Sequence, residues 1–449
     1  MTIDERLSRV PDYTFFHGVD ELYAHAKRIA ESNPDICRHI YIGESQSGLR
    51  IPMVSVGKGP VSILLFASPH PNEPIGAMMA YFLLEELVAS PEMREGRTWH
   101  IIPCIDPDGT RMNEGWFKGP FTLKNYARDF YRPKGDNQVE WTFPLEYKTF
   151  KFDRPIPETR ALMHAIDTTR PAVMYSLHNS GFGGAYYYIS QPLKALYPLL
   201  HRIPLERGVP LSLGEPEAPY CKELYPAIYA TNYAKDAYDY FAKFAKGDPA
   251  QYMFGGGSSK DYASTVSNPF ILITEVPYFM SEKIGDTSPA GRKRGEVLLE
   301  GYEKSNRLLL TAKEIIDATI ADVKEGAIFR DTSSDFVNLI LKRSEGEMLW
   351  AQSEEVMQQD ATVAQVAHAL YLERFYKGLT ISMYRRALKA QLEKGGSRTI
   401  EQAYQKLDIL IDSLMEEIGQ ALDYSVIPIR NLVQIQYGAL LAVLETLKV

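Results

Sequence analysis

The first 280 residues alternate between short apolar segments and longer segments of helical periodicity. The apolar segments are rich in Val, Ile, Phe and Tyr, and Gly, Pro, Ser or Asp bounds most of them, which is typical of strands. Several are apolar on both alternations, as expected for strands that helices cover on both faces. The pattern therefore predicts an α/β fold, with a mixed and largely buried β-sheet flanked by helices. The predicted strands are Arg38–Ile42, Ile51–Val56, Val61–Ala67, Trp99–Ile105, Ala172–Leu177, Tyr186–Ile189 and Ile271–Glu275, and the predicted helices are Val19–Ser32, Ile75–Ala89 and Glu158–Thr168.

Two later stretches depart from this alternation. The stretch from about 190 to 255 is rich in Pro and Tyr and has weak periodicity, so we predict an insertion over one face of the sheet. From about residue 292 to the end the pattern is helical. With a boundary near Gly326, the sequence predicts an α/β domain over residues 1–326 and an α-helical C-terminal domain over residues 327–449.

The C-terminal segment contains one apolar stripe. Tyr404, Leu407, Ile411, Leu414 and Ile418 are spaced by three and four residues, which places them on one face of a helix. Such a face must be buried against something. One interpretation is packing within the chain. The other is a symmetric homodimer through the C-terminal helices, because two-fold association is the commonest kind of oligomer.

The composition is that of an ordinary globular protein, because 45% of the 449 residues are apolar and 24% are charged. The net charge of −8 disfavours binding to nucleic acid or to a membrane surface. No apolar run approaches the roughly 18 residues of a membrane span. The three cysteines stand far apart, and Asp4 and Glu5 near the start argue against a signal peptide. We therefore expect a cytoplasmic, reduced protein with neither nucleic acid nor a membrane as a partner.

Candidate chemistry begins with His70 and Glu73, which follow the predicted strand Val61–Ala67 and precede a helix that starts near Pro74. Polar groups at the carboxyl end of a sheet strand are where α/β proteins bind ligands. Two histidines and one glutamate with an open fourth position form a known catalytic zinc arrangement. The HxxE pattern alone is common, and a solvated pair of loop residues would give the same sequence.

His178 is the candidate third ligand, because it also directly follows a predicted strand. The alternative is a strand-end histidine that hydrogen-bonds to the backbone. The remaining histidines lie in predicted helices, polar loops or strands, and they are His17, His25, His39, His100, His164, His201 and His368.

Glu275 is a lone carboxylate in an otherwise apolar predicted strand. Burying an unpaired carboxylate is costly, so Glu275 needs a partner. A zinc-bound water would supply one, which makes Glu275 a candidate general base. The alternative is a strand-end glutamate paired with a lysine.

These residues belong to a series of motifs that resembles the zinc metallocarboxypeptidases of the carboxypeptidase A-like superfamily. The order of the motifs over about residues 10–280 makes the resemblance specific, and the long gap between His178 and Glu275 agrees with the predicted insertion. The resemblance implies a zinc carboxypeptidase-like fold. It implies one Zn²⁺ per chain, bound by His70, Glu73 and His178, with Glu275 as general acid and base. The motifs are HPNE at 70–73, PDG with TRMN at 107–113, RDF at 128–130, SLHN at 176–179, GGSSKDY at 256–262 and TEVP at 274–277.

The resemblance also implies three residues that contact the substrate. Arg111 would polarise the scissile carbonyl, Arg128 would bind the terminal carboxylate, and Tyr252 would close over the substrate. Ala127 stands where the family has an asparagine, and Arg132 is an alternative to Arg128.

The implied activity is zinc-dependent hydrolysis of a C-terminal peptide bond in a substrate with a free carboxylate. One alternative is a zinc-dependent N-acyl-amino-acid deacylase, or an amidase acting on γ-glutamyl or cell-wall type peptides. Another is a non-catalytic peptide-binding scaffold. The sequence does not fix the preferred side chain. Ser259 and Lys260 fall near the family's pocket floor, where Lys260 would favour an acidic terminal residue unless it is a surface lysine.

Overall fold

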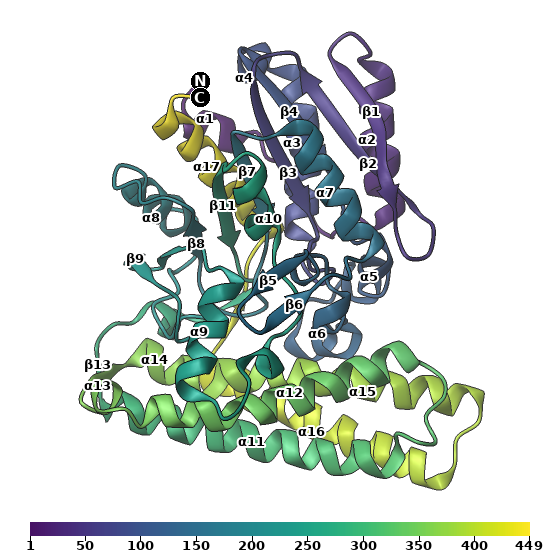
Figure 1. Ribbon diagram of the computed structural model, residues 1–449, viewed down its shortest axis with the longest axis vertical. Coiled ribbons are helices and arrows are strands. Elements are labelled where there is room, and N and C mark those ends of the chain that lie inside the picture. The colour runs from purple at the N-terminus through teal and green to yellow at the C-terminus, as the bar shows by residue number, and fades with distance from the viewer.

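The computed structural model describes residues 1–449. Its centre is a nine-stranded mixed sheet with the order β1-β2-β4-β3-β7-β11-β8-β10-β9 (Figure 1). The four middle strands β4, β3, β7 and β11 are parallel, while β2 and β8 run antiparallel to them. This sheet confirms the predicted fold class. The strands are β1 Cys37–Glu44, β2 Arg50–Gly57, β3 Val61–Ala67, β4 Arg97–Ile102, β7 Val173–Leu177, β8 Tyr186–Ile189, β9 Glu223–Tyr225, β10 Ile228–Ala230 and β11 Phe270–Glu275.

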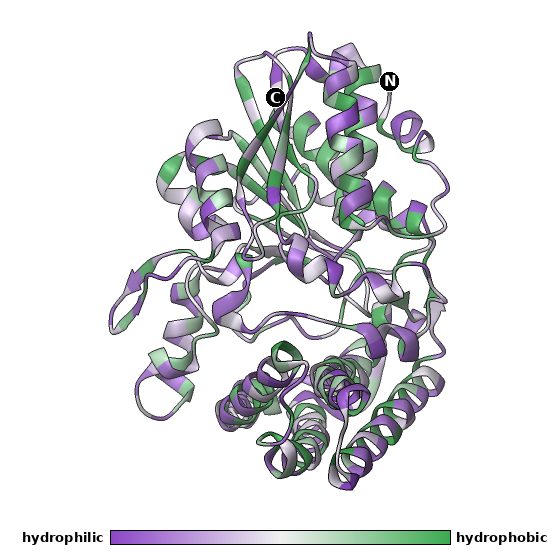
Figure 2. Cartoon of the chain, turned by 90° about the vertical axis from the view of Figure 1, so that its right-hand side faces the viewer, coloured by the Kyte–Doolittle hydropathy of each residue, from purple (hydrophilic) through white to green (hydrophobic).

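Helices cover both faces of the sheet. One face carries α2 (Val19–Ser32), α3 (Ile75–Ala89) and α17 (Ile429–Leu447), and the other carries α7 (Pro157–Thr169) and α10 (Ser259–Val266). Figure 2 shows that the strands between these helices are largely hydrophobic.

Strand β3 shows why the predicted strands are apolar on both alternations. Ile63 and Leu65 pack in the core under α3, while Leu64 and Phe66 pack in the core under α7. Alternate side chains of a strand point to opposite faces, so the middle of a strand covered on both sides has no position that faces solvent.

The stretch predicted as an insertion extends the sheet at one edge. It forms α8 (Tyr197–Leu205), β9, β10 and α9 (Ala234–Phe244). Strand β10 pairs in parallel with β8, and β9 pairs with β10. The sequence predicted an insertion over one face of the sheet, whereas part of this stretch extends the sheet itself. Strands of three residues are too short to produce a recognisable periodicity, so the sequence pattern did not reveal them.

Residues 294–422 form a helical layer that packs across one end of the sheet (Figures 1 and 2). Its central helix is α15, which packs against α11, α12 and α16 and also against α6 (Leu123–Asp129). The helices of this layer are α11 Arg294–Thr319, α12 Ala327–Ala351, α13 Glu354–Met357, α14 Val363–Ala367, the π-helical turn His368–Leu372, α15 Glu373–Lys394 and α16 Arg398–Leu422.

The apolar stripe of the C-terminal segment lies on α16 and is buried within the chain. Leu407, Ile411, Leu414 and Ile418 are at most 4% exposed. They face the interior because α16 packs against α15 and α6. The homodimer stays a prediction, and this stripe no longer supports it.

The last helix leaves the helical layer and returns to the sheet. Helix α17 packs against α1 (Ile3–Ser8), α3 and α8, and the two chain ends lie close together in Figure 1. The predicted boundary near Gly326 separates α11 from α12, although these two helices pack against each other. The contacts favour a different division, with the helical layer as one unit and α17 as part of the α/β unit.

No helix combines the length and the apolar character needed to cross a membrane. Cys37, Cys104 and Cys221 are free thiols.

The remaining elements of the chain are short. They are α4 Pro91–Arg94, α5 Pro107–Arg111, β5 Leu145–Tyr147, β6 Phe150–Phe152, β12 Phe279–Met280, β13 Pro289–Lys293, β14 Asp360–Thr362 and β15 Ser425–Val426, with 3-10 turns at Glu114–Trp116, Gly135–Asn137, Val139–Trp141, Pro249–Tyr252 and Glu282–Gly285.

Candidate active site

His70, Glu73 and His178 lie at the carboxyl ends of two neighbouring parallel strands. His70 and Glu73 follow β3, His178 follows β7, and the two strands pair up to their last residues, Ala67 and Leu177. Directly after β3 the backbone of Ser68 takes a φ of 53°, a left-handed conformation that turns the chain sharply. Carboxyl ends of parallel strands meet at one edge of a sheet, so the fold brings residues together that are far apart in the sequence.

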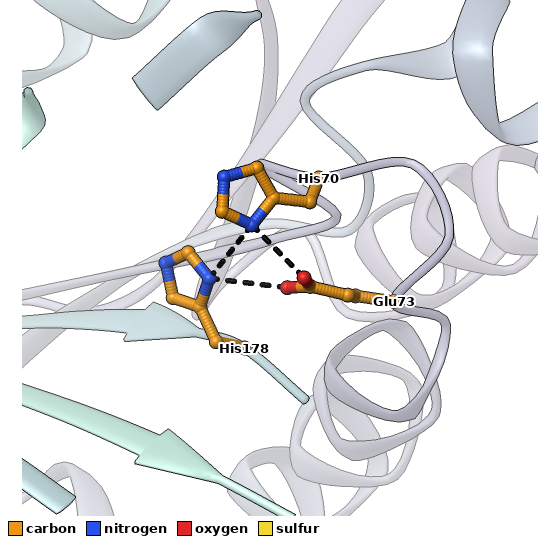
Figure 3. A group of neighbouring side chains, drawn as sticks. All are labelled: His70, Glu73 and His178. Carbon is orange, nitrogen blue, oxygen red and sulfur yellow. Dashed lines mark hydrogen bonds and ion pairs between the residues drawn. The ribbon is translucent and has the colours of Figure 1, made fainter. Parts of the chain in front are cut away.

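The three side chains point at one another (Figure 3). Nδ1 of His70 lies 2.9 Å from one carboxylate oxygen of Glu73 and 3.1 Å from Nδ1 of His178. Nδ1 of His178 lies 3.1 Å from the other carboxylate oxygen of Glu73. All three residues are buried, and one ligand atom from each lies within 4.8 Å of the others. Two imidazole nitrogens and a carboxylate that converge in this way fit a zinc ion.

Glu140 supports His178 from the opposite side of its ring. The Glu140 carboxylate accepts a hydrogen bond from Ser176 Oγ at 2.8 Å and another from the backbone N–H of Ser259 at 2.8 Å. Nε2 of His178 lies 2.8 Å from Ser176 Oγ and 3.6 Å from Glu140. A proton kept on Nε2 leaves Nδ1 free for a metal, and such partners orient metal-binding histidines. Glu140 was not predictable from the sequence, because no local pattern places its short turn against β7.

Burial and mutual charge shift the pKa values in this cluster. Burial, followed by the charge of Arg132, lowers the pKa of His70 to about 4, so this imidazole is neutral. Burial alone would lower the pKa of His178, but its hydrogen bonds to Glu140 and Glu73 outweigh burial and raise that pKa to about 10. His70 and His178 likewise outweigh burial at Glu73 and hold its pKa below the ordinary range. An ionised Glu73 and a neutral His70 are the forms in which a carboxylate and an imidazole bind a metal.

Glu275 ends β11, the strand on the far side of β7, and one of its carboxylate oxygens lies 3.9 Å from Nδ1 of His178. Burial, followed by the negative charge of Glu73, raises the pKa of Glu275 well above its ordinary value. No lysine lies within 4.0 Å of the carboxylate, so the alternative of a lysine pair is not formed. A carboxylate with a raised pKa beside a metal cluster is suited to accept and then deliver a proton.

A cavity of about 560 Å³ contains this cluster and Glu275. Its lining comes from the α/β unit and also from the helical layer, which contributes side chains of α11, α12 and α15. The helical layer is therefore part of the wall of the candidate active site.

Arg111 and Arg128 do not line this cavity. Arg111 is exposed and pairs with Asp20 at 2.5 Å. Arg128 pairs with Asp412 of α16 at 2.7 Å, where α6 meets the helical layer. The substrate contacts implied for these two arginines stay predictions, and their positions do not favour them.

Arg132 does line the cavity. Its Nη1 lies 3.5 Å from the carboxylate of Glu73, and its Nε donates to Gln138 Oε1 at 3.0 Å. Gln138 is buried and donates in turn to the carbonyl of Pro133 at 2.7 Å, which fixes its orientation. The geometry favours Arg132 over Arg128, the alternative that the sequence left open.

Tyr252 is buried outside the cavity. Its ring stacks on Phe241 with centroids 5.4 Å apart, and its hydroxyl donates to the carbonyl of Lys246 at 2.8 Å. By contrast, Tyr376 of α15 lines the cavity, and its hydroxyl donates to the carbonyl of Phe182 at 3.0 Å. No sequence motif linked Tyr376 to the site, because the contact joins positions 194 residues apart.

Helix α17 contributes one side chain to the support of the cluster. Gln436 is fully buried, and its Nε2 donates to the backbone carbonyl of His178 at 2.7 Å. The backbone carbonyl of Gln436 accepts the hydroxyl of Tyr175, on β7, at 3.0 Å. The last helix of the chain is thereby tied to the strand end that bears His178.

We expect Gln436→Leu to weaken zinc binding by roughly tenfold or more, the usual effect of losing a partner of a metal ligand. The substitution leaves the carbonyl of His178 without its donor. Gln434→Leu is the matched control, because it removes a similar bond of 2.8 Å to the carbonyl of Leu7, in α1. Competition with a chelator measures both affinities, and equal values would contradict a positioning role for Gln436.

Comparisons with known proteins find a matching family and individual relatives. A family model described as zinc carboxypeptidase matches residues 22–278, more than half of the chain. Zinc carboxypeptidase A 1 of Drosophila melanogaster is 27% identical over 122 residues, which cover 24% of this chain and 28% of that protein. A zinc carboxypeptidase of Simulium vittatum is 31% identical over 101 residues, which cover 21% of this chain and 33% of that protein. The matches span no more than about a third of the length of these curated relatives.

Two solved structures align with somewhat more than half of this chain. Carboxypeptidase A from Helicoverpa armigera aligns with a TM-score of 0.39 and 16% identity, over 59% of this chain and 65% of that chain. A metallo-carboxypeptidase from Burkholderia cenocepacia aligns with a TM-score of 0.34 and 12% identity, over 58% of this chain and 60% of that chain. The family match ends at residue 278, so the helical layer and α17 lie outside it.

Proposed function

This chain belongs to the zinc carboxypeptidase family, and from that premise we propose that it is a zinc-dependent metallocarboxypeptidase that hydrolyses the C-terminal amide bond of a peptide. The observation that carries the proposal is the meeting of His70, Glu73, His178 and Glu275 in one cavity. The zinc ligands would be the first three of these residues. A cytoplasmic location, predicted from the sequence, stays a prediction.

In this proposal each residue has a separate task. Zinc, when bound, would polarise the scissile carbonyl and lower the pKa of a bound water. Glu275 takes a proton from the attacking water and later gives it to the leaving amine. Glu140 and Ser176 keep the proton of His178 on Nε2, and Gln436 holds the backbone of the same residue.

Arg132 is the residue that we propose binds the terminal carboxylate of the substrate. It lines the cavity next to the cluster, and Gln138 holds its Nε. A guanidinium presents several N–H groups in a fixed plane, which suits paired hydrogen bonds to a carboxylate. Recognition of that group would limit the enzyme to the last peptide bond.

We expect Arg132→Ala to lower kcat/KM on peptides with a free terminal carboxylate by about 10- to 100-fold, because a hydrogen bond to a charged group is worth roughly 1.5–3 kcal/mol. Converting that carboxylate to an amide should slow the wild type by a similar factor and the variant very little. Zinc content is measured in parallel, since Arg132 also lies near Glu73.

Arg128→Ala is the matched control for this prediction, because Arg128 pairs with Asp412 outside the cavity. It should keep the wild-type preference for a free carboxylate. If Arg128→Ala loses that preference and Arg132→Ala keeps it, the assignment to Arg132 is wrong.

One experiment tests the proposed activity as a whole. Zinc-loaded protein is incubated with a diverse library of peptides and N-acyl-amino acids, and the products are identified by mass spectrometry. Release of single C-terminal residues from peptides is the expected result. Products only from N-acyl-amino acids or from γ-glutamyl peptides would replace the proposal with the deacylase or amidase alternative.

A further inference from the structure

Helix α12 of the helical layer, which lies outside the family match, is tied to the segment that leads into α10. Arg343 of α12 donates from Nε to the backbone carbonyl of Tyr252 at 2.9 Å, and its Nη2 donates to the same oxygen. Its guanidinium carbon lies 4.6 Å from the ring centre of Phe254 and 5.0 Å from that of Phe241. One charged side chain of the helical layer thus holds both the backbone and a side chain of this segment.

The backbone of residues 252–255 has few other attachments. The carbonyls of these four residues accept no hydrogen bond except those from Arg343, and the N–H groups of Phe254 and Gly255 donate none. Phe336, also on α12, packs its ring against that of Phe254, with the ring centres 5.3 Å apart. The position of this segment therefore depends on α12.

The segment continues as three consecutive glycines, which run beside the turn 135–143. Gly257 exchanges backbone hydrogen bonds with Phe143 at 2.8 and 3.1 Å. Only glycine allows so close an approach, because a Cβ atom at Gly255 would lie 2.3 Å from the carbonyl oxygen of Trp141. The segment held by α12 is therefore in direct backbone contact with this turn.

The turn carries two side chains that orient residues of the candidate active site. Glu140 lies 3.6 Å from Nε2 of His178, and Gln138 accepts the Nε–H of Arg132 at 3.0 Å. The segment adds two hydrogen bonds of its own, because the backbone N–H and Oγ of Ser259 donate to Glu140 at 2.8 and 2.9 Å. A continuous series of contacts thus leads from α12 to a proposed zinc ligand.

We propose that Arg343 is a positioning residue for the metal site, which acts by holding residues 252–259 against Glu140. Without it the two donors of Ser259 are less firmly placed on Glu140, and Glu140 in turn orients His178 less well. Groups that orient a metal-binding histidine contribute to the affinity for the metal. The inference rests on the zinc site of the proposed function, and it gives the helical layer a task within that site.

The test measures zinc affinity by competition with a chelator in the wild type, two single variants and their double variant. Arg343→Met keeps an unbranched side chain beside the two aromatic rings but removes the hydrogen bonds to Tyr252. It should weaken zinc binding by about 3- to 10-fold, less than the loss of a direct partner of a ligand. Glu140→Gln removes such a partner and should weaken binding by about 10- to 100-fold. Because Arg343 acts through Glu140, the double variant should bind zinc about as well as Glu140→Gln alone.

Arg343→Lys keeps the charge and a donor, so it should restore part of the affinity that Arg343→Met loses. Lys342→Met is the matched control on α12, because Lys342 is exposed and its side chain bonds to that of Gln251 at 3.1 Å. This control should bind zinc as tightly as the wild type. Thermal unfolding checks that each variant is folded at the temperature of the titration, and Arg343→Gln replaces Arg343→Met if that variant does not fold.

Unchanged zinc affinity in Arg343→Met would overturn the inference. Losses that multiply in the double variant would also overturn it, because they would show that Arg343 does not act through Glu140. The titrations need no substrate, so they separate this inference from the proposed activity. If no peptide is hydrolysed but the losses do not multiply, the carboxypeptidase proposal fails and the positioning role stands. A wild type that binds no zinc would overturn both.

Discussion

Replacing Glu275 by glutamine is expected to lower kcat by at least about 10²-fold, the usual contribution of a positioned general base. The substitution keeps the size of the side chain at the end of β11 but removes its ability to accept a proton. Zinc content should stay at the wild-type level, because the three proposed ligands are untouched. Steady-state kinetics and metal analysis on the same preparation measure both quantities.

Glu217→Gln is a suitable control for that variant. Glu217 is another carboxylate of the cavity, where it accepts the hydroxyls of Tyr186 and Tyr188 and makes no ion pair with His178. Its replacement should change kcat far less than the replacement of Glu275. Near wild-type turnover in Glu275→Gln would remove this residue from the mechanism.

The sheet was predictable from the sequence because its strands are buried on both faces. Strands such as β3, β7 and β11 carry no charged residue or histidine until they end, so a titratable residue at that point stands out. His70, His178 and Glu275 were each found in this way, and the parallel pairing of the three strands brings them together. Local pattern and global fold agree at these positions.

The substrate contacts were harder to predict, because they depend on pairs of residues that are distant in the sequence. The RDF motif favoured Arg128, but Arg128 pairs with Asp412, which is 284 positions away. Gln436 is likewise 258 positions from the histidine that it supports. A motif describes neighbours along the chain and gives no information about a partner supplied by the helical layer or by α17.

The same limitation applies to Arg343. Nothing in the helical periodicity of α12 distinguishes this arginine from the exposed Lys342 beside it. Only the packing of the helical layer against the α/β unit places one of the two in the wall of the cavity and leaves the other at the surface.

Removing either histidine ligand is expected to abolish stoichiometric zinc binding. In His70→Ala or His178→Ala only two of the three proposed protein ligands remain, and three are the minimum found in catalytic zinc sites. Metal analysis after dialysis should find about one zinc per wild-type chain and almost none in either variant. Zinc at 100 times its dissociation constant should also raise the free energy of unfolding of the wild type by about 2.7 kcal/mol and leave both variants unchanged.

His100→Ala is the control for the loss of a histidine from the sheet. His100 lies on β4 and interacts with Ser55 Oγ at 2.8 Å, on the neighbouring strand and apart from the cluster. This variant should still bind zinc, and zinc should still stabilise it, even if the variant without zinc is less stable than the wild type. Stoichiometric zinc in His70→Ala or in His178→Ala would show that the metal is held by other residues. Glu275 would then no longer be supported as the general base beside the metal.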